Sequence, residues 1–112
     1  MSEMSFVTFR DRTYRVKNNI LVLKNKGINS IDEIEGLQNI PYLTSIDLSN
    51  NNIQEIKGLE NLPGLINLNL SANRIAEIKG LETITNLNNL DLSRNGIIEI
   101  KGLDTLKKLR IL

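Results

Sequence analysis

Residues 43–64 read LTSIDLSNNNIQEIKGLENLPG, and the chain repeats this pattern directly afterwards. The segments 43–64, 65–86 and 87–108 align without a gap, and ten of their 22 columns are identical in all three copies. A period this regular predicts a repeat architecture, in which each copy is one structural unit that stacks on its neighbours. Each copy alone is too small to bury its apolar face, so stacking is what drives folding.

Within one copy the apolar residues follow two periods. Ile46 and Leu48 alternate with a polar residue, which is typical of a short strand with one buried face. From Ile53 to Leu62 the apolar residues recur at every third position, which favours a short 3-10 or α-helical turn. Each copy is therefore predicted to form a strand, a sharp turn and a helical turn, with the strands of successive copies in one parallel sheet.

The turn after each strand carries an asparagine at the same column, namely Asn51, Asn73 and Asn95. A sharp turn leaves inward-pointing backbone N–H and C=O groups unpaired, and an amide side chain can both donate and accept hydrogen bonds. We therefore predict that these three residues form a structural asparagine ladder between the layers.

A degenerate copy lies upstream of the three full repeats. Leu21, Leu23 and Ile28 match the repeat at an offset of 25 residues, whereas Gly36 and Leu37 match it at an offset of 22, so three residues are inserted. The sequence thus predicts four parts. They are an N-terminal β-hairpin cap over residues 1–17, a degenerate first repeat over 18–42, three 22-residue repeats over 43–108, and the uncapped start of a fifth repeat strand over 109–112.

The pattern LxxLxLxxNxI, present in each full copy, resembles the leucine-rich repeat family. The 22-residue period is similar to the subclass that includes the regulatory subunit of the type-one protein phosphatase and bacterial internalin-type repeats. This resemblance covers residues 21–112 and implies a right-handed α/β solenoid arc. It places a parallel β-sheet on the concave face and short 3-10 or α turns on the convex face. The first copy departs from the pattern, because Lys26 stands at the asparagine column and Asn18 at the leading leucine column.

The N-terminal residues are expected to cover the first layer of the stack. Residues 5–10 and 13–17 favour two strands joined by Asp11 and Arg12, and Asn18-Asn19 favours a turn into a strand at 20–23. The side chains expected to fill the end of the core are Phe6, Phe9, Tyr14 and Val16.

Composition excludes most catalytic chemistry. The chain has no Cys and no His, so it has no disulfide, thiol nucleophile, imidazole base or usual zinc site. No apolar run reaches the roughly 20 residues of a membrane span. We expect a cytoplasmic protein that is not an enzyme, does not enter a membrane, and has no catalytic, cofactor or metal site.

The net charge of +1 gives no overall attraction to nucleic acid. Residues 1–30 nevertheless carry six basic and two acidic side chains, whereas residues 31–112 carry eight and eleven. The basic side chains of this N-terminal tip are Arg10, Arg12, Arg15, Lys17, Lys24 and Lys26. Along the repeats, each lysine of one column is matched by a glutamate of another, which does not favour a phosphate-binding surface.

The residues between the buried positions of each strand are predicted to point outward on the concave face. The candidate binding face consists of Ser45, Asp47, Ser49, Ile66, Asn67, Asn69, Asn89, Asp91 and Arg94. Interfaces draw much of their energy from aromatic and arginine side chains, and here only Arg94, with Ile66 as a lesser anchor, is of that kind. Asp47 and Asp91 lie on a flat polar sheet, which offers no cleft for acid–base catalysis.

The C-terminal segment is the candidate self-association edge. Its residues are Leu109, Arg110, Ile111 and Leu112. An open edge strand over an uncovered core invites pairing with another chain. Two explanations remain open, a cut from a longer array or a face covered by a second copy, and we expect the second, a homodimer.

The sequence favours a non-catalytic scaffold that binds protein and self-associates through this edge. Two alternatives stay open. Near-identical copies also fit a designed or recently duplicated array without a dedicated partner. The basic tip, or the likeness to the phosphatase subunit, would instead fit an accessory nucleic-acid or phosphatase-regulatory module.

Overall fold

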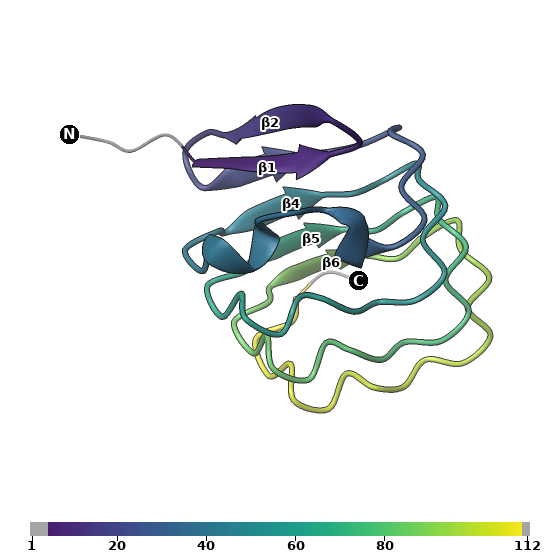
Figure 1. Cartoon of the computed structure of the whole chain (residues 1–112). Coiled ribbons are helices and arrows are strands. Elements are labelled where there is room, and N and C mark those ends of the chain that lie inside the picture. Colours follow the sequence, from purple (N-terminus) through teal and green to yellow (C-terminus); the bar gives the residue numbers. More distant parts are fainter. Residues whose placement is uncertain (1–4, 111–112) are drawn as a thin grey trace.

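The computed structural model describes residues 5–110 and shows a stack of parallel strands with a β-hairpin over one end (Figure 1). The elements in chain order are β1 Ser5–Phe9, β2 Arg12–Val16, β3 Ile20–Val22, the 3-10 helices η1 Ile31–Glu33 and η2 Leu37–Asn39, β4 Ser45–Asp47, β5 Asn67–Asn69 and β6 Asn89–Asp91. Strands β3, β4, β5 and β6 form one parallel sheet in sequence order, and β1 and β2 form a separate antiparallel sheet. The predicted solenoid arc with a parallel sheet is confirmed.

The strands pair in the register of the sequence repeat. Ser45 lies beside Asn67, and Asn67 lies beside Asn89, so each step from β4 to β6 is one 22-residue period, whereas Ile20 of β3 lies beside Ser45 at the offset of 25. The middle residue of each strand is buried and its two neighbours are more exposed, as the alternation of a strand with one core-facing side requires. The sheet therefore presents two rows of outward-facing side chains.

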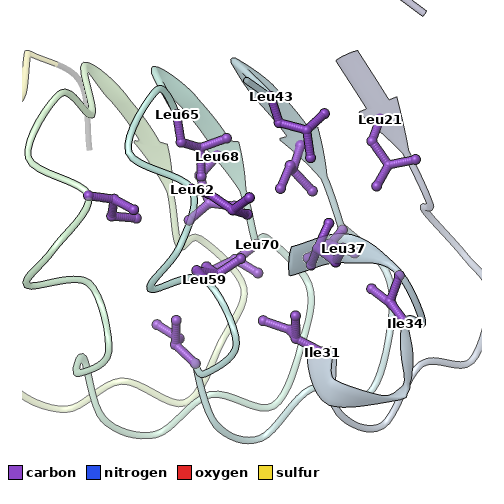
Figure 2. Packing of buried hydrophobic residues seen from close by; sticks show 14 of the residues in the cluster. Leu21, Ile31, Ile34, Leu37, Leu43, Leu59, Leu62, Leu65, Leu68 and Leu70 are labelled. Carbon is purple, nitrogen blue, oxygen red and sulfur yellow. The ribbon is translucent and has the colours of Figure 1, made fainter. Parts of the chain in front are cut away.

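Aliphatic side chains fill the space behind the sheet in columns that continue from layer to layer. Figure 2 shows Leu43 and Leu65 at equivalent positions, and both are fully buried. Leu37, Leu59 and Leu81 make a second such column. Each fully buried side chain of this size contributes roughly 1.5–3 kcal/mol before conformational entropy is subtracted. A layer thus gains its stability from the faces of its neighbours.

The asparagine ladder ties each layer to the one before it. The Nδ2 of Asn73 donates to the carbonyl oxygen of Leu70 in its own layer at 3.0 Å, and to that of Leu48 in the preceding layer at 3.0 Å. Its Oδ1 accepts from the backbone N–H of Ile53 at 2.9 Å. Asn51 and Asn95 make the equivalent bonds to their own layer and to the layer before it. One side chain therefore satisfies backbone groups that the sharp turn leaves without partners.

The three inserted residues of the first repeat accommodate a 3-10 helix. Ser30 and Glu33 cap η1, because the Ser30 side chain accepts from Asp32 N and the Glu33 side chain accepts from Ser30 N. In the full repeats the segment equivalent to η2 forms only single hydrogen-bonded turns, such as Leu62 N to Leu59 O at 3.2 Å. The helical turn predicted for every copy is thus a 3-10 helix in the first copy and shorter in the others.

The invariant glycine of each full repeat lies where the chain comes close to the preceding layer. Gly80 has a φ of +81°, and a Cβ there would lie 2.1 Å from the Ile56 carbonyl oxygen. Gly102 has a φ of +78°, and its Cβ would lie 2.3 Å from the Ile78 carbonyl oxygen. Only glycine fits both the left-handed backbone and this close approach.

The N-terminal hairpin covers the first layer with a different set of side chains from the predicted one. Val7, Phe9 and Val16 are buried in the core cluster, and Tyr14 packs against it. The prediction for Phe6 is wrong, because its side chain is 47% exposed. Side chains of a strand alternate between its two faces, so Phe6 and Phe9 cannot both point inward.

Two short contacts attach the hairpin to the first repeat. The turn of the hairpin is Arg10-Asp11, with φ of 50° and 67°, and not Asp11-Arg12 as the sequence suggested. Asn18 and Asn19 form a second turn with positive φ, in which Lys17 and Ile20 exchange backbone hydrogen bonds of 3.1 and 2.8 Å. On the other strand Thr8 and Glu35 exchange bonds of 3.0 and 2.8 Å. The hairpin therefore meets β3 at a single bridge and does not extend the main sheet.

Candidate functional site

The concave side of the sheet holds an open hollow of about 490 Å³. Six of the predicted concave residues lie around it: Ser45, Asp47, Asn67, Asn69, Asn89 and Asp91. The others that line it are Ile20, Val22, Ile46, Leu68 and Leu90. The structure thus brings residues from all four strands of the main sheet to one surface.

The prediction that Ser49 points outward is wrong. Ser49 is 5% exposed, because its hydroxyl turns back and donates to Asp47 Oδ1 at 2.7 Å. The backbone N–H of Ser49 donates to the same oxygen at 3.0 Å. The equivalent pairs Asn69 with Ser71 and Asp91 with Ser93 repeat this arrangement. The serine column is therefore part of the turn, and Ser49 does not belong to the concave surface.

This turn uses only one atom of each outward-facing side chain. Oδ1 of Asp47, Asn69 and Asp91 accepts both bonds from the serine two residues on. The second terminal atom, a carboxylate oxygen in the two aspartates and an amide nitrogen in Asn69, is left for other partners. The aspartate row, formed by Asp47, Asn69 and Asp91, therefore offers two carboxylate acceptors that lie two strands apart, with the amide donor of Asn69 between them.

Hydrogen bonding keeps Asp91 ionised. The Ser93 hydroxyl and backbone N–H lower the pKa of Asp91 from its ordinary value, and the nearby Arg94 guanidinium adds to this effect. The opposite effect of burial is weaker. A carboxylate with a lowered pKa is a poor general acid at neutral pH, so this geometry favours electrostatic attraction over proton transfer.

The side chains of the other outward row, Ser45, Asn67 and Asn89, hydrogen-bond to one another. Asn67 Nδ2 donates to Ser45 Oγ at 3.0 Å, and Asn89 Nδ2 donates to Asn67 Oδ1. These side chains link the strands across the sheet at the row that begins β4, β5 and β6. They leave less bonding capacity for a ligand than the aspartate row does.

Besides Ser49, two predicted residues lie outside the hollow. Ile66 is 37% exposed and precedes β5, where its backbone bonds to Thr44. Arg94 follows β6 in a left-handed conformation with φ of 58°, beside Leu92 and Ile97 at the last layer. The two anchors that the sequence indicated are therefore at the margin of the surface and not at its centre.

The structure adds two residues that sequence reasoning missed. Ile20 and Val22 are 44% and 49% exposed on β3, beside Ser45 and Asp47 in the register of the sheet. They occupy the columns that are polar in every full repeat. The offset of 25 residues gives this correspondence, but the predicted binding face includes residues of the three full repeats only.

The last described layer is covered on one side only. Leu109 packs against the core, and Arg110 N donates to Asn88 O at 2.8 Å, so a further strand begins to pair there. Ile111 and Leu112 of the predicted self-association edge lie outside the described residues. Ile98 and Ile100 are 94% and 66% exposed, although the core column of Ile100 is buried in the two repeats before it.

Charged side chains on the other surfaces pair with one another. Lys79 lies 3.7 Å from Glu55 of the preceding repeat and 3.9 Å from Glu77, and all three are about half exposed. Such exposed pairs contribute about 0–1 kcal/mol each. In the basic tip, Arg10 donates to Gly27 O at 3.0 Å and Lys26 lies over the Tyr14 ring. Arg10 and Lys26 of the basic tip therefore hold the hairpin cap against the first repeat.

Residues 5–110 contain neither a cluster of metal ligands nor a membrane-spanning helix. No three Asp or Glu side chains gather there into a possible metal site. The helices of this part of the chain are also too short to cross a bilayer.

Known proteins share this repeat and this fold. A family model described as Leucine Rich repeats (2 copies) matches residues 41–83. An internalin structure from Listeria monocytogenes is 33% identical with a TM-score of 0.72, over 81% of this chain and 26% of the internalin. A chain of the SNF/U2A′ complex of Drosophila melanogaster is 32% identical with a TM-score of 0.68, over 88% of this chain and 56% of that one.

These relatives are longer than the chain, which spans about a quarter and about half of their lengths. No curated protein sequence matches the chain significantly. Proteins of this repeat type generally act as scaffolds for protein–protein interaction. The repeat pattern, the parallel sheet with its asparagine ladder and these similarities together show that the chain has the leucine-rich repeat fold.

Proposed function

We propose that this chain is a non-catalytic scaffold that binds a segment of another protein on its concave sheet. The observation that carries the proposal is the hollow of about 490 Å³, because four strands supply it with exposed aliphatic, amide and carboxylate groups. Ligand surfaces usually combine an apolar area with a few convergent polar groups in this way. Rigid strands hold these groups, so binding costs little ordering of the scaffold.

A peptide selection with site-directed variants tests this proposal. Random peptides displayed on phage are selected against the chain, and the selected binders are measured against Asn67→Arg, which places a bulky charge at the centre of the concave face. Ala76→Arg on the other side of the solenoid, beside Glu77 and Lys101, is the matched control. We expect Asn67→Arg to abolish binding and Ala76→Arg to leave it unchanged, with both variants folded by circular dichroism. Binders that respond only to Ala76→Arg would overturn the proposal.

We propose as a second function that the chain self-associates through the face of the last layer, with a second copy as the occupant. The observation that favours it is the exposure of Ile98 and Ile100 at 94% and 66%, beside the partly buried Ile97 and Leu103. Contiguous exposed aliphatic groups mark interaction surfaces in folded proteins.

Sedimentation velocity on the 112-residue chain at tens of micromolar tests self-association. We expect a dimer, and we expect Ile100→Lys to give a monomer because it places a charge in the contact. Ile66→Lys, which changes an exposed isoleucine away from this face, should leave the dimer intact. A monomeric wild-type chain at these concentrations would rule the dimer out.

A further inference from the structure

We infer that the concave sheet selects an extended basic segment with one aliphatic anchor, in the spacing aliphatic-x-basic-x-basic. This inference rests on the proposed concave binding function and names the partner chemistry. It follows from an asymmetry of the surface. The aliphatic pair, Ile20 and Val22, occupies β3, and the carboxylates, Asp47 and Asp91, occupy β4 and β6.

The aliphatic pair supplies the anchor contact. Ile20 and Val22 are 44% and 49% exposed, whereas Leu21 between them is fully buried. The equivalent positions of β4, β5 and β6 are Ser, Asn or Asp, so exposed aliphatic side chains on the outward rows are confined to one edge strand of the hollow. Burying such a side chain against a ligand is favourable in proportion to the apolar area removed from water. One apolar side chain of the ligand should therefore lie over β3.

The carboxylates supply the charge selectivity. Asp47 and Asp91 are the charged residues among the eleven that line the hollow, so its field is negative. Each uses Oδ1 for its own turn, which leaves Oδ2 for a partner, and hydrogen bonds to Ser93 hold Asp91 ionised. Arg94 lies outside the hollow, beside the last layer. Lysine or arginine side chains of a ligand complement this arrangement, and acidic segments are repelled.

The strand spacing sets the order and the distance between these groups. Neighbouring strands lie about 4.8 Å apart, so Asp47 is roughly one step and Asp91 roughly three steps, or about 14 Å, from the aliphatic pair. A peptide that crosses the strands in extended form places every second side chain on the same face, at intervals of about 6.7 Å. The side chain two residues after the anchor then lies between β4 and β5, within reach of Asp47. The side chain four residues after it lies over β6, close to Asp91.

A pair of synthetic peptides tests the spacing directly. The probe is Gly-Ser-Leu-Ser-Lys-Ser-Lys-Ser-Gly, and the control, Gly-Ser-Leu-Lys-Lys-Ser-Ser-Ser-Gly, has the same composition with the basic residues moved together. Binding is followed by amide chemical shifts of the full chain in NMR titrations. We expect the probe to shift signals of β3, β4 and β6 and to bind at least about threefold more tightly than the control, as one exposed charge pair implies. No binding of the probe, or equal binding of the two peptides, would overturn the inference.

Variants taken from the chain's own repeats test the residues. Asp91→Asn introduces the residue that stands in this column at Asn69, whose Oδ1 bonds Ser71 in the same way, so the fold is kept while the charge is lost. We expect it to weaken the probe about two- to fivefold and to reduce the dependence of binding on salt. Val22→Asn should weaken the probe more strongly and Val22→Leu should preserve binding. If neither Asp91→Asn nor Val22→Asn weakens the probe, the inference is wrong.

The two proposals fail in different ways. If the phage selection yields binders that need Asn67 but lack the aliphatic-x-basic-x-basic order, the concave scaffold stands and the partner chemistry does not. If the selection yields no binders sensitive to Asn67→Arg and the probe does not bind, both fail.

Discussion

The second and third full repeats, residues 65–86 and 87–108, carry the same residues at most core columns but lie in different surroundings. Ile78 is 2% exposed, while Ile100 at the same column is 66% exposed. Asn73 is 8% exposed, while Asn95 is only partly buried. The comparison shows that a core residue of this fold is stabilised mainly by the next layer and only partly by its own repeat, as expected for a one-dimensional stack.

The strongest test of this comparison truncates the same column in both repeats. Ile78→Ala should lower the free energy of unfolding by about 2–5 kcal/mol, because it leaves a cavity between two packed layers. Ile100→Ala should lower it by less than about 1 kcal/mol, since its side chain is mostly in water. Urea denaturation followed by circular dichroism measures both, at a concentration where sedimentation shows a monomer. Equal losses would mean that a further surface covers the last layer.

The asparagine ladder gives a second, smaller contrast. Asn73→Ala should cost about 2–3 kcal/mol, because it leaves buried backbone groups such as Ile53 N and Leu48 O without partners. Asn95→Ala should cost less, since water reaches the last layer and can replace part of the amide. Asn73→Asp separates the two functions of the amide, because a carboxylate can accept from Ile53 N but cannot donate to Leu48 O. A larger loss for Asn95 than for Asn73 would contradict the comparison.

A local backbone change should affect both repeats alike. Ala72 and Arg94 have φ of 55° and 58°, in the left-handed region that disfavours most side chains. Ala72→Gly and Arg94→Gly should each raise the free energy of unfolding by about 0.4–1 kcal/mol. Thermal and urea unfolding measure the effect, with Asn50→Gly as the control, since asparagine already tolerates this conformation. Unequal gains would show that covering the layer also relieves the strain.

How much of this could be read from the sequence depends on whether the repeat rule applies. The 22-residue period predicted the parallel strands and the position of Asn73, because identical columns must occupy identical environments. Ser49 was misplaced because a period of two describes only the strand, and the chain turns immediately after Asp47. Phe6 was misplaced because the prediction assigned both Phe6 and Phe9 to the core and ignored the alternation of side chains along the strand. Ile20 and Val22 were missed because the first copy is degenerate and its columns are offset by the insertion.

The smallest expected effect concerns pH at the outward column, where residue 69 is asparagine and residue 91 is aspartate. Because the folded pKa of Asp91 is lowered, its ionised form stabilises the fold above the pKa of the unfolded chain. This contribution is lost as pH falls below about 4 and through the lowered folded pKa. The stability of wild type relative to Asp91→Asn should therefore decline in acid. The stability difference between wild type and Ser71→Ala should not change with pH, because Ser71 bonds the neutral Asn69 and both chains keep Asp91. Equal pH profiles for wild type and Asp91→Asn would contradict this.

The constant register of the stack places equivalent side chains of the concave face at equal intervals, one strand spacing apart. Since β4, β5 and β6 pair with one another at one 22-residue period, a duplicated copy of residues 65–86 would supply its own glycine, asparagine and core columns to both neighbours. Such an insertion would move Asp91 away from Val22 by one strand spacing, about 4.8 Å, without altering either side chain. The distance between the aliphatic pair and Asp91 can therefore change only by whole strand spacings, so the number of repeats sets the length of the segment that the surface accepts.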